Sequence, residues 1–224
     1  MLYIVLSRER CGSNLLVNYI NQLTDATVIN SKQWFSQPSI LNNFNFIDNN
    51  VVVKTHHKKM ISIIVPNNSV SLIIADRRDC FGAVMSTLVA DHTNQWGVDD
   101  YLKNIKVDPF WCNYHTFAAT LLYRLQWYAN IENEFSVFSI KKIYYEDIIE
   151  GGAAYVANFL GVDQQSNITI STVPSPHSYT TLITNWKELK TAFSHCLDVI
   201  QEHGLETVCN WKFDDILNQH VKSM

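Results

Sequence analysis

The sequence predicts an α/β fold, in which a central, mainly parallel sheet is covered by helices on both faces to give three layers. Short apolar runs typical of buried strands recur along the chain. Most of these runs are followed by a stretch whose apolar residues lie three and four positions apart, as in an amphipathic helix. The 224 residues are 47% apolar, which is enough for one core, so we expect a single domain over residues 1–224.

The sequence predicts five strands and five helices, and three of the strands are each followed by a helix. The strands share an apolar run bounded by polar residues, and they cover residues 2–6, 51–53, 71–75, 135–138 and 140–145. The helices share apolar side chains at helical spacing, and they cover residues 15–23, 81–89, 113–131, 148–160 and 186–203. Gly161 stands where a glycine commonly ends a helix. Residues 166–184 are rich in Ser, Thr and Pro and predict a long loop.

Charge and cysteine content exclude several classes of protein. A net charge of −4 argues against broad affinity for nucleic acid or anionic membranes, because both require a basic surface. No stretch approaches the roughly 18 apolar residues of a membrane span, and the run at residues 2–6 is too short for a signal peptide. We therefore expect an intracellular, cytoplasmic protein. The five cysteines contain no C-x-x-C pair, so neither a disulfide framework nor a zinc site is predicted.

A polar loop at residues 7–14 joins the first expected strand to the first expected helix. At such a junction, free backbone N–H groups and the helix dipole favour an anion. Gly12 permits close approach of a ligand, and Ser13 and Asn14 can donate hydrogen bonds. Arg10 adds a positive charge. The Walker A pattern of common ATP and GTP sites is absent from the sequence. Taken alone, the loop is equally well explained as a polar strand-to-helix turn.

The run Arg10-Cys11-Gly12-Ser13-Asn14 resembles the 5′-phosphosulfate loop of the sulfotransferases that use 3′-phosphoadenosine 5′-phosphosulfate (PAPS). Cys11 stands where that family usually has Ser, and Asn14 stands where it usually has a hydroxyl residue. The resemblance implies a P-loop NTPase-like fold. It also implies that the five residues of this run bind the 5′ end of the nucleotide.

Arg78 and Ser86 carry a second part of the resemblance. Ser86 follows Arg78 by eight positions, which is the spacing of the family's 3′-phosphate motif, an Arg at a strand end and a Ser on the next helix. The resemblance implies that both residues bind the 3′-phosphate. The chemistry is suitable, because Arg presents a planar fork to a phosphate and a hydroxyl can complete the contact. The alternative is a solvated helix start with Asp79 as its N-cap.

A third part of the resemblance is Lys54-Thr55-His56, directly after the strand expected at residues 51–53. Cytosolic sulfotransferases carry Lys-Thr-His at this place, which implies that His56 is the general base and that Lys54 lies near the bridging oxygens. A neutral imidazole suits this role because its ordinary pKa of about 6.5 is close to the working pH. His57 is one residue out of register. The alternative is a basic strand end that faces water.

Tyr145-Glu146-Asp147, with a later Phe-Leu-Gly161, resembles a strand-to-helix stretch of the same family. We assign it no catalysis and expect Glu146 or Asp147 to cap the helix. Bacterial glycolipid-type members use an acidic base shortly after the first helix, and residues 31–35 contain no counterpart. This difference favours His56 as the base.

The resemblance implies transfer of the sulfuryl group from PAPS to a hydroxyl or amine of an unidentified small molecule, carbohydrate or peptide, without a metal. Arg10, Lys54 and His56 are the expected catalytic residues. Two alternatives remain open: a nucleotide or small-molecule kinase, for which Asp76 is the nearest acidic magnesium ligand, and a non-catalytic nucleotide-binding module. Aromatic residues offer an acceptor pocket, although core packing explains most of them equally well, and they include Trp34, Phe35, Trp96, Phe110 and Trp111.

Overall fold

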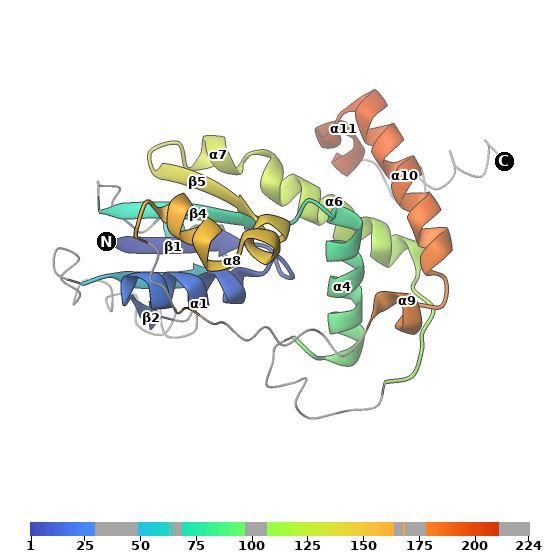
Figure 1. Ribbon diagram of the computed structural model, residues 1–224. Helices are drawn as coiled ribbons and strands as arrows, with labels where there is room; N and C mark the ends of the chain where they lie inside the picture. Colours follow the sequence, from blue (N-terminus) through green and yellow to red (C-terminus); the bar gives the residue numbers. More distant parts are fainter. Residues whose placement is uncertain are drawn as a thin grey trace. The chain divides into compact units, whose positions relative to one another are not determined.

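The computed structural model of the chain describes residues 1–29, 49–62, 64, 69–96, 107–163, 168 and 178–210 (Figure 1). The chain divides into two compact units, which we describe one after the other. The first unit comprises Met1–Arg78 and Glu132–Thr172, and the second comprises Asp79–Ile131 and Val173–Met224. The expectation of a single domain stays a prediction.

The first unit is built on a parallel sheet, which in the described part of the chain has five strands in the order β2-β3-β1-β4-β5. This confirms the α/β class with a central parallel sheet flanked by helices. The strands are β1 (Leu2–Ser7), β2 (Thr27–Ile29), β3 (Val51–Thr55), β4 (Val70–Asp76) and β5 (Ser139–Tyr144). β1 is buried along its whole length, as expected of a central strand covered on both faces.

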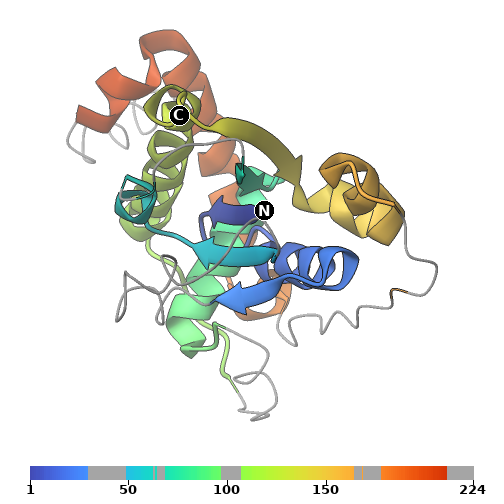
Figure 2. The same cartoon turned by 90° about the vertical axis from the view of Figure 1, so that its left-hand side faces the viewer.

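Two helices pack against one face of this sheet, α1 (Ser13–Thr24) and α8 (Tyr145–Leu160). Figure 2 shows both on the same side of the strands. Their buried residues recur at helical spacing and join the sheet in one apolar cluster, which includes Leu16, Ile20, Val156, Val5 and Ile73. α8 ends at Gly161, whose φ of 74° is the left-handed conformation predicted for it. A short helix, α3 (Lys58–Ile61), follows β3.

The strand predicted at residues 135–138 is wrong. A short helix, α7 (Ile131–Glu134), precedes this segment, and the Phe138 N–H donates to the Phe135 carbonyl at 2.9 Å, which closes a turn. Both phenylalanine side chains are buried, whereas Val137 is 70% exposed. Residues three apart face opposite sides of a strand, whereas the turn brings the two ring centroids within 6.4 Å of each other. β5 begins directly after this turn.

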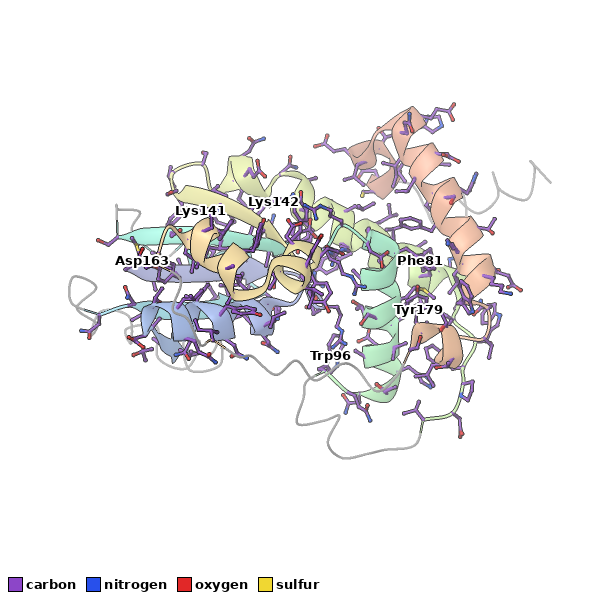
Figure 3. All side chains as sticks on the ribbon, in the orientation of Figure 1. Phe81, Trp96, Lys141, Lys142, Asp163 and Tyr179 are labelled. Atoms are coloured by element: carbon purple, nitrogen blue, oxygen red, sulfur yellow. The ribbon has the colours of Figure 1, made fainter. Side chains whose placement is uncertain are left out.

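The second unit is helical in its described part. Its helices are α4 (Cys80–Thr93), α6 (Tyr114–Ala129), α9 (Tyr179–Leu182), α10 (Trp186–His203) and α11 (Leu205–Asn210). Phe81 stands at the centre of their core, with its ring centroid 6.1 Å from that of Phe117 and 5.9 Å from that of Tyr179 (Figure 3). The helices predicted around residues 81–89, 113–131 and 186–203 are confirmed. Of the loop predicted at residues 166–184, most lies outside the described residues, and α9 forms within the rest.

The strand order places β1 beside the point where the chain reverses direction across the sheet. From β1 the chain passes to β2 and β3 on one side, and it then crosses to β4 on the other side. Leu6 pairs with Thr55 and Ser7 pairs with Ala75, so the carboxyl ends of β1, β3 and β4 lie at one edge. Open α/β sheets bind ligands at the carboxyl edge beside such a reversal. The fold therefore directs attention to the loops that follow these strands.

Candidate active site

The loop between β1 and α1 has the backbone pattern of an anion site. Arg10 has a φ of 64° and Gly12 a φ of 70°, whereas Cys11 between them has no positive φ. Such alternation turns successive N–H groups toward one side, as in anion-binding nests. Gly12 also occupies the N-cap of α1 without a side chain to cap it, so the first N–H groups of this helix remain for other acceptors. The predicted loop residues, including the buried Ser13 and Cys11, therefore surround one helix start.

Tyr145 forms a wall against this loop. A Cβ atom at Gly12 would lie 2.3 Å from Cδ2 of Tyr145, which is inside van der Waals contact. On the Tyr145 ring, the guanidinium carbon of Arg77 lies 5.3 Å from the centroid. Position 12 therefore requires glycine for two reasons, its positive φ and the adjacent ring. The resemblance did not assign Tyr145 to the loop.

Lys54 reaches from the end of β3 to the start of α1. Its Nζ donates to Oδ1 of Asn14 at 2.6 Å. Burial lowers the pKa of Lys54, and the negative charge of Glu9 opposes this shift. The structure thus brings together Lys54 and Asn14, two of the residues assigned to the nucleotide, and their binding of an anion stays a prediction. The amide of Asn14 keeps its NH₂ donors while its oxygen accepts from Lys54.

His56 lies directly after β3 and is half-buried. Its Nδ1 lies 2.7 Å from the backbone carbonyl oxygen of Ser7, at the end of β1. A carbonyl oxygen only accepts, so Nδ1 carries the proton and the lone pair of the neutral ring is on Nε2. Among the described residues, Nε2 has no hydrogen-bond partner. The imidazole is therefore held in the tautomer that a general base requires.

The surroundings of His56 favour its neutral form. Burial is the largest cause that lowers the pKa of His56, and the charges of Lys54 and Arg8 lower it further. The hydrogen bond to Ser7 and the charge of Glu9 act in the opposite direction. Glu9 is itself paired with Arg8 at 2.6 Å. At neutral pH the ring is thus an available base rather than an imidazolium ion.

Arg78 follows β4 and is held by the first turn of α8. Its Nη1 donates to Oδ1 of Asp147, and its Nη2 donates to Oδ2 of the same carboxylate at 2.8 Å. Its backbone N–H donates to Oε2 of Glu146 at 3.0 Å. The hydrogen bonds from Arg78 lower the pKa of Asp147. The prediction that Glu146 or Asp147 caps the helix is wrong, because the N-cap is Tyr144 and the two carboxylates turn toward the arginine instead.

The residues after Arg78 belong to the second unit. Asp79 is the N-cap of α4, and its side chain accepts from the Gly82 N–H at 2.8 Å, as the alternative explanation of this segment predicts. Ser86 is half-buried on the same helix, and its place beside the 3′-phosphate stays a prediction. Asp76, the acidic candidate of a kinase, accepts from the Arg77 N–H at 2.7 Å, and its other oxygen lies 3.8 Å from Nζ of Lys142.

Three of the five aromatic residues considered for an acceptor pocket lie within the described residues. Trp96 is 39% exposed and Trp111 is 57% exposed. The other candidate of this unit, Phe110, stacks on the ring of His92 with the centroids 3.7 Å apart. Trp34 and Phe35 lie outside the described residues, as does the whole segment 31–35.

The described residues contain no group of three or more His, Cys, Asp or Glu side chains that could hold a metal ion. Among the helices within the described ranges, none has the length and apolar character to cross a membrane.

Sequence reasoning missed three kinds of contact at this site. The Ser7 carbonyl orients His56 through the backbone, which leaves no trace in side-chain types. Tyr145 packs on Gly12 across the sheet, and nothing in the spacing indicates this. The third contact had a signal: an Arg pair follows one strand, and an acidic pair follows the neighbouring parallel strand at the same sheet edge, so Arg78 and Asp147 could have been paired from charge and topology.

Comparisons with family models, with curated proteins and with solved structures gave no match to this chain. The functional conclusion therefore rests on the geometry of the site and on the resemblance of its motifs.

Proposed function

We propose that the chain is a PAPS-dependent sulfotransferase with a P-loop NTPase-like fold. The observation that carries the proposal is the placing of His56, with its proton on Nδ1 and its lone pair on Nε2, at the same sheet edge as Lys54 and the loop at residues 10–14. A base, a cation and an anion-binding loop in this relationship fit a reaction that deprotonates an acceptor beside a bound phosphosulfate.

In the proposed reaction, Nε2 of His56 takes the proton of the acceptor hydroxyl or amine. The acceptor atom forms a bond to sulfur while the bond between sulfur and the bridging phosphate oxygen breaks, and the electron pair leaves on that oxygen. The products are the sulfated acceptor and adenosine 3′,5′-bisphosphate. Arg10 and Lys54 neutralise the charge that grows on the phosphate, and the N–H groups at Gly12 and Ser13 hold its oxygens.

Two features of the fold support a nucleotide donor. The loop at residues 8–12 lies where β1 meets α1, at the carboxyl edge beside the reversal in strand order. Gly12 lets the backbone approach a phosphate closely, and the ring of Tyr145 closes the other side of the loop.

The proposal is tested by incubating the protein with PAPS labelled with ³⁵S and a panel of hydroxyl and amine acceptors. We expect label in at least one acceptor, with adenosine 3′,5′-bisphosphate formed in equal amount. His56→Ala should abolish most of the transfer, whereas His57→Ala, one residue away and exposed, is the matched control. Transfer of the γ-phosphate of ATP to the same panel, without transfer of sulfate, would identify the kinase alternative instead.

A further inference from the structure

The guanidinium group of Arg78 is fixed on one edge and on one face. Asp147 accepts from both of its terminal nitrogens, and the ring centroid of Tyr144 lies 4.4 Å from its central carbon. Nevertheless, 53% of the Arg78 side chain is exposed. The group is therefore immobilised while it still faces solvent.

Asp147 is in turn held by a residue beyond the break in α8, where Gly152 has non-helical backbone dihedrals. The hydroxyl of Tyr155 donates to Oδ2 of Asp147 at 3.2 Å. The neighbouring Glu146 accepts from the backbone N–H of Arg78 at 3.0 Å. Both ends of the arginine, its backbone and its head group, are thus anchored to the first turn of α8.

The contact with Asp147 leaves part of the guanidinium available. The group has five N–H donors, and the bidentate contact uses one from each terminal nitrogen. The Nε–H of Arg78 has no partner among the described residues, and each terminal nitrogen retains a second hydrogen. An oxyanion can therefore bind along the Nε edge without displacing Asp147.

We propose that Asp147, together with Tyr144, is a positioning residue that sets the preference of the site for a 3′-phosphorylated nucleotide by holding Arg78 ready to bind that phosphate. This inference rests on the proposed function. A free arginine side chain carries much rotamer freedom that is lost on binding, and an arginine that is already fixed loses less of it. The phosphate then binds to a group whose donors already point outward.

Removing the charge of Asp147 distinguishes a positioning role from a direct electrostatic effect on the bound phosphate, because the two change the affinity in opposite directions. A carboxylate close to a bound phosphate repels it, so removing the charge of Asp147 would by itself strengthen binding. Loss of positioning weakens binding. Asp147→Asn keeps the size of the side chain and removes its charge, and the two explanations therefore predict opposite changes.

The matched control is Glu150→Gln, which removes the same charge from the same helix. Glu150 is exposed and makes no ion pair within the part of the chain that the structure describes. A second variant, Tyr155→Phe, removes only the hydroxyl that holds Asp147. It provides a milder perturbation if Asp147→Asn lowers the stability of the fold, which thermal unfolding of each variant would show.

The experiment measures the dissociation constants of adenosine 3′,5′-bisphosphate and of AMP for each variant by calorimetry. We expect Asp147→Asn to weaken the binding of the bisphosphate by about three- to thirtyfold and to leave the binding of AMP almost unchanged. Tyr155→Phe should give a smaller loss of the same kind, and Glu150→Gln none. In the background of Arg78→Ala, Asp147→Asn should have no further effect on the bisphosphate.

Three results would overturn the inference. Tighter binding of the bisphosphate by Asp147→Asn would show that Asp147 competes with the phosphate for Arg78. An equal loss for AMP and bisphosphate would show a merely structural role. If the wild-type protein binds the bisphosphate and Asp147→Asn leaves the affinities for both nucleotides unchanged, Asp147 is not part of the site and the proposed function stays intact. If the wild-type protein binds neither nucleotide, the proposed function fails, and this inference fails with it.

Discussion

The Nδ1 atom of His56 lies 2.7 Å from the backbone carbonyl oxygen of Ser7. This hydrogen bond joins the ends of two neighbouring parallel strands, β3 and β1, at the edge where the candidate site forms. Because Ser7 is fully buried and its carbonyl belongs to the strand end, the imidazole is oriented by a buried part of the sheet. The Ser7 hydroxyl oxygen lies 3.4 Å from the same nitrogen, so the backbone carbonyl is the closer of the two groups that orient His56.

Replacement of the proposed base is the first prediction. His56→Ala should lower the turnover of labelled PAPS by about 10²- to 10⁴-fold, the usual contribution of a positioned general base, with little change in nucleotide affinity. Steady-state kinetics and calorimetry measure the two quantities separately. Near-normal turnover in His56→Ala together with loss of turnover in His57→Ala would assign the base to the neighbouring residue.

The second prediction concerns the pKa of His56, which burial and two nearby cations lower below its ordinary value of about 6.5. Turnover should therefore persist to lower pH than an ordinary histidine would allow, and it should fall as the pH drops through the lowered pKa and His56 becomes protonated. The same depressed pKa makes the unfolded chain bind the proton more readily. The stability that this group contributes is thus fully present above about pH 6.5 and is lost as the pH falls through the folded-state pKa.

Two substitutions, one that removes a nearby cation and one that removes a nearby anion, test the electrostatic contribution to the lowered pKa of His56. Lys54→Met removes a cation and should raise the pKa of His56, whereas Glu9→Gln removes an anion and should lower it. NMR titration of the His56 ring measures both without any substrate. Shifts in the same direction for the two variants would contradict the electrostatic explanation.

The third prediction separates the two reasons for glycine at position 12. Gly12 and Gly161 have nearly the same φ, 70° and 74°, but only Gly12 lies against Tyr145, and a Cβ at Gly161 would meet nothing within 4 Å. Gly161→Ala should therefore cost about 1–2 kcal/mol of unfolding free energy from backbone strain alone. Gly12→Ala should cost about 1–3 kcal/mol more, because the added methyl group displaces the ring.

Urea unfolding of the two alanine variants measures this difference. Adding Tyr145→Ala to Gly12→Ala should recover part of the extra loss, since the clash is then relieved, although the ring contact itself is also removed. Equal losses for Gly12→Ala and Gly161→Ala would show that Tyr145 does not confine the loop.

The fourth prediction distinguishes the two arginines assigned to the donor. Removing a charged hydrogen-bond partner costs roughly 1.5–3 kcal/mol, or about 10- to 150-fold in affinity. Arg78→Ala should lose this much for adenosine 3′,5′-bisphosphate and almost nothing for AMP. Arg10→Ala should depress turnover more than product binding, because charge shifts at its end of the donor during the reaction. If Arg78→Ala weakens the binding of both nucleotides equally, Arg78 does not bind the 3′-phosphate. The segment is then explained as a helix start capped by Asp79.

Four of the five strands in the described part of the chain and the longer helices could be predicted from the sequence because burial follows simple periods, whereas the three-residue β2 was not predicted. β1 is buried along its whole length, and α1 and α10 bury one stripe of side chains each. The strand predicted at residues 135–138 was wrong because its apolar residues fit more than one geometry. Phenylalanine is common in strands, but a segment of four residues is too short to distinguish a buried strand from a turn that buries both rings.

Within the site, the sequence predicted residues but not their partners. Lys54, His56 and the loop at residues 10–14 follow from motif and strand position, and the structure brings them to one sheet edge. The carbonyl of Ser7 orients His56 through the backbone, and the ring of Tyr145 packs against Gly12. Neither contact can be predicted from a pattern of residue types. Asp147 was taken for a helix cap because acidic residues commonly start helices, whereas the nearby guanidinium of Arg78 is the stronger partner.

The proposed donor site is tested most directly by calorimetric titration of the wild-type protein with adenosine 3′,5′-bisphosphate, AMP, and ATP with Mg²⁺. We predict one bound bisphosphate per chain, AMP bound at least about tenfold more weakly, and no binding of ATP with Mg²⁺. The bisphosphate should also raise the midpoint of thermal unfolding, because it binds the native state only. Binding of ATP with Mg²⁺ in the absence of bisphosphate binding would contradict the sulfotransferase proposal and favour a kinase.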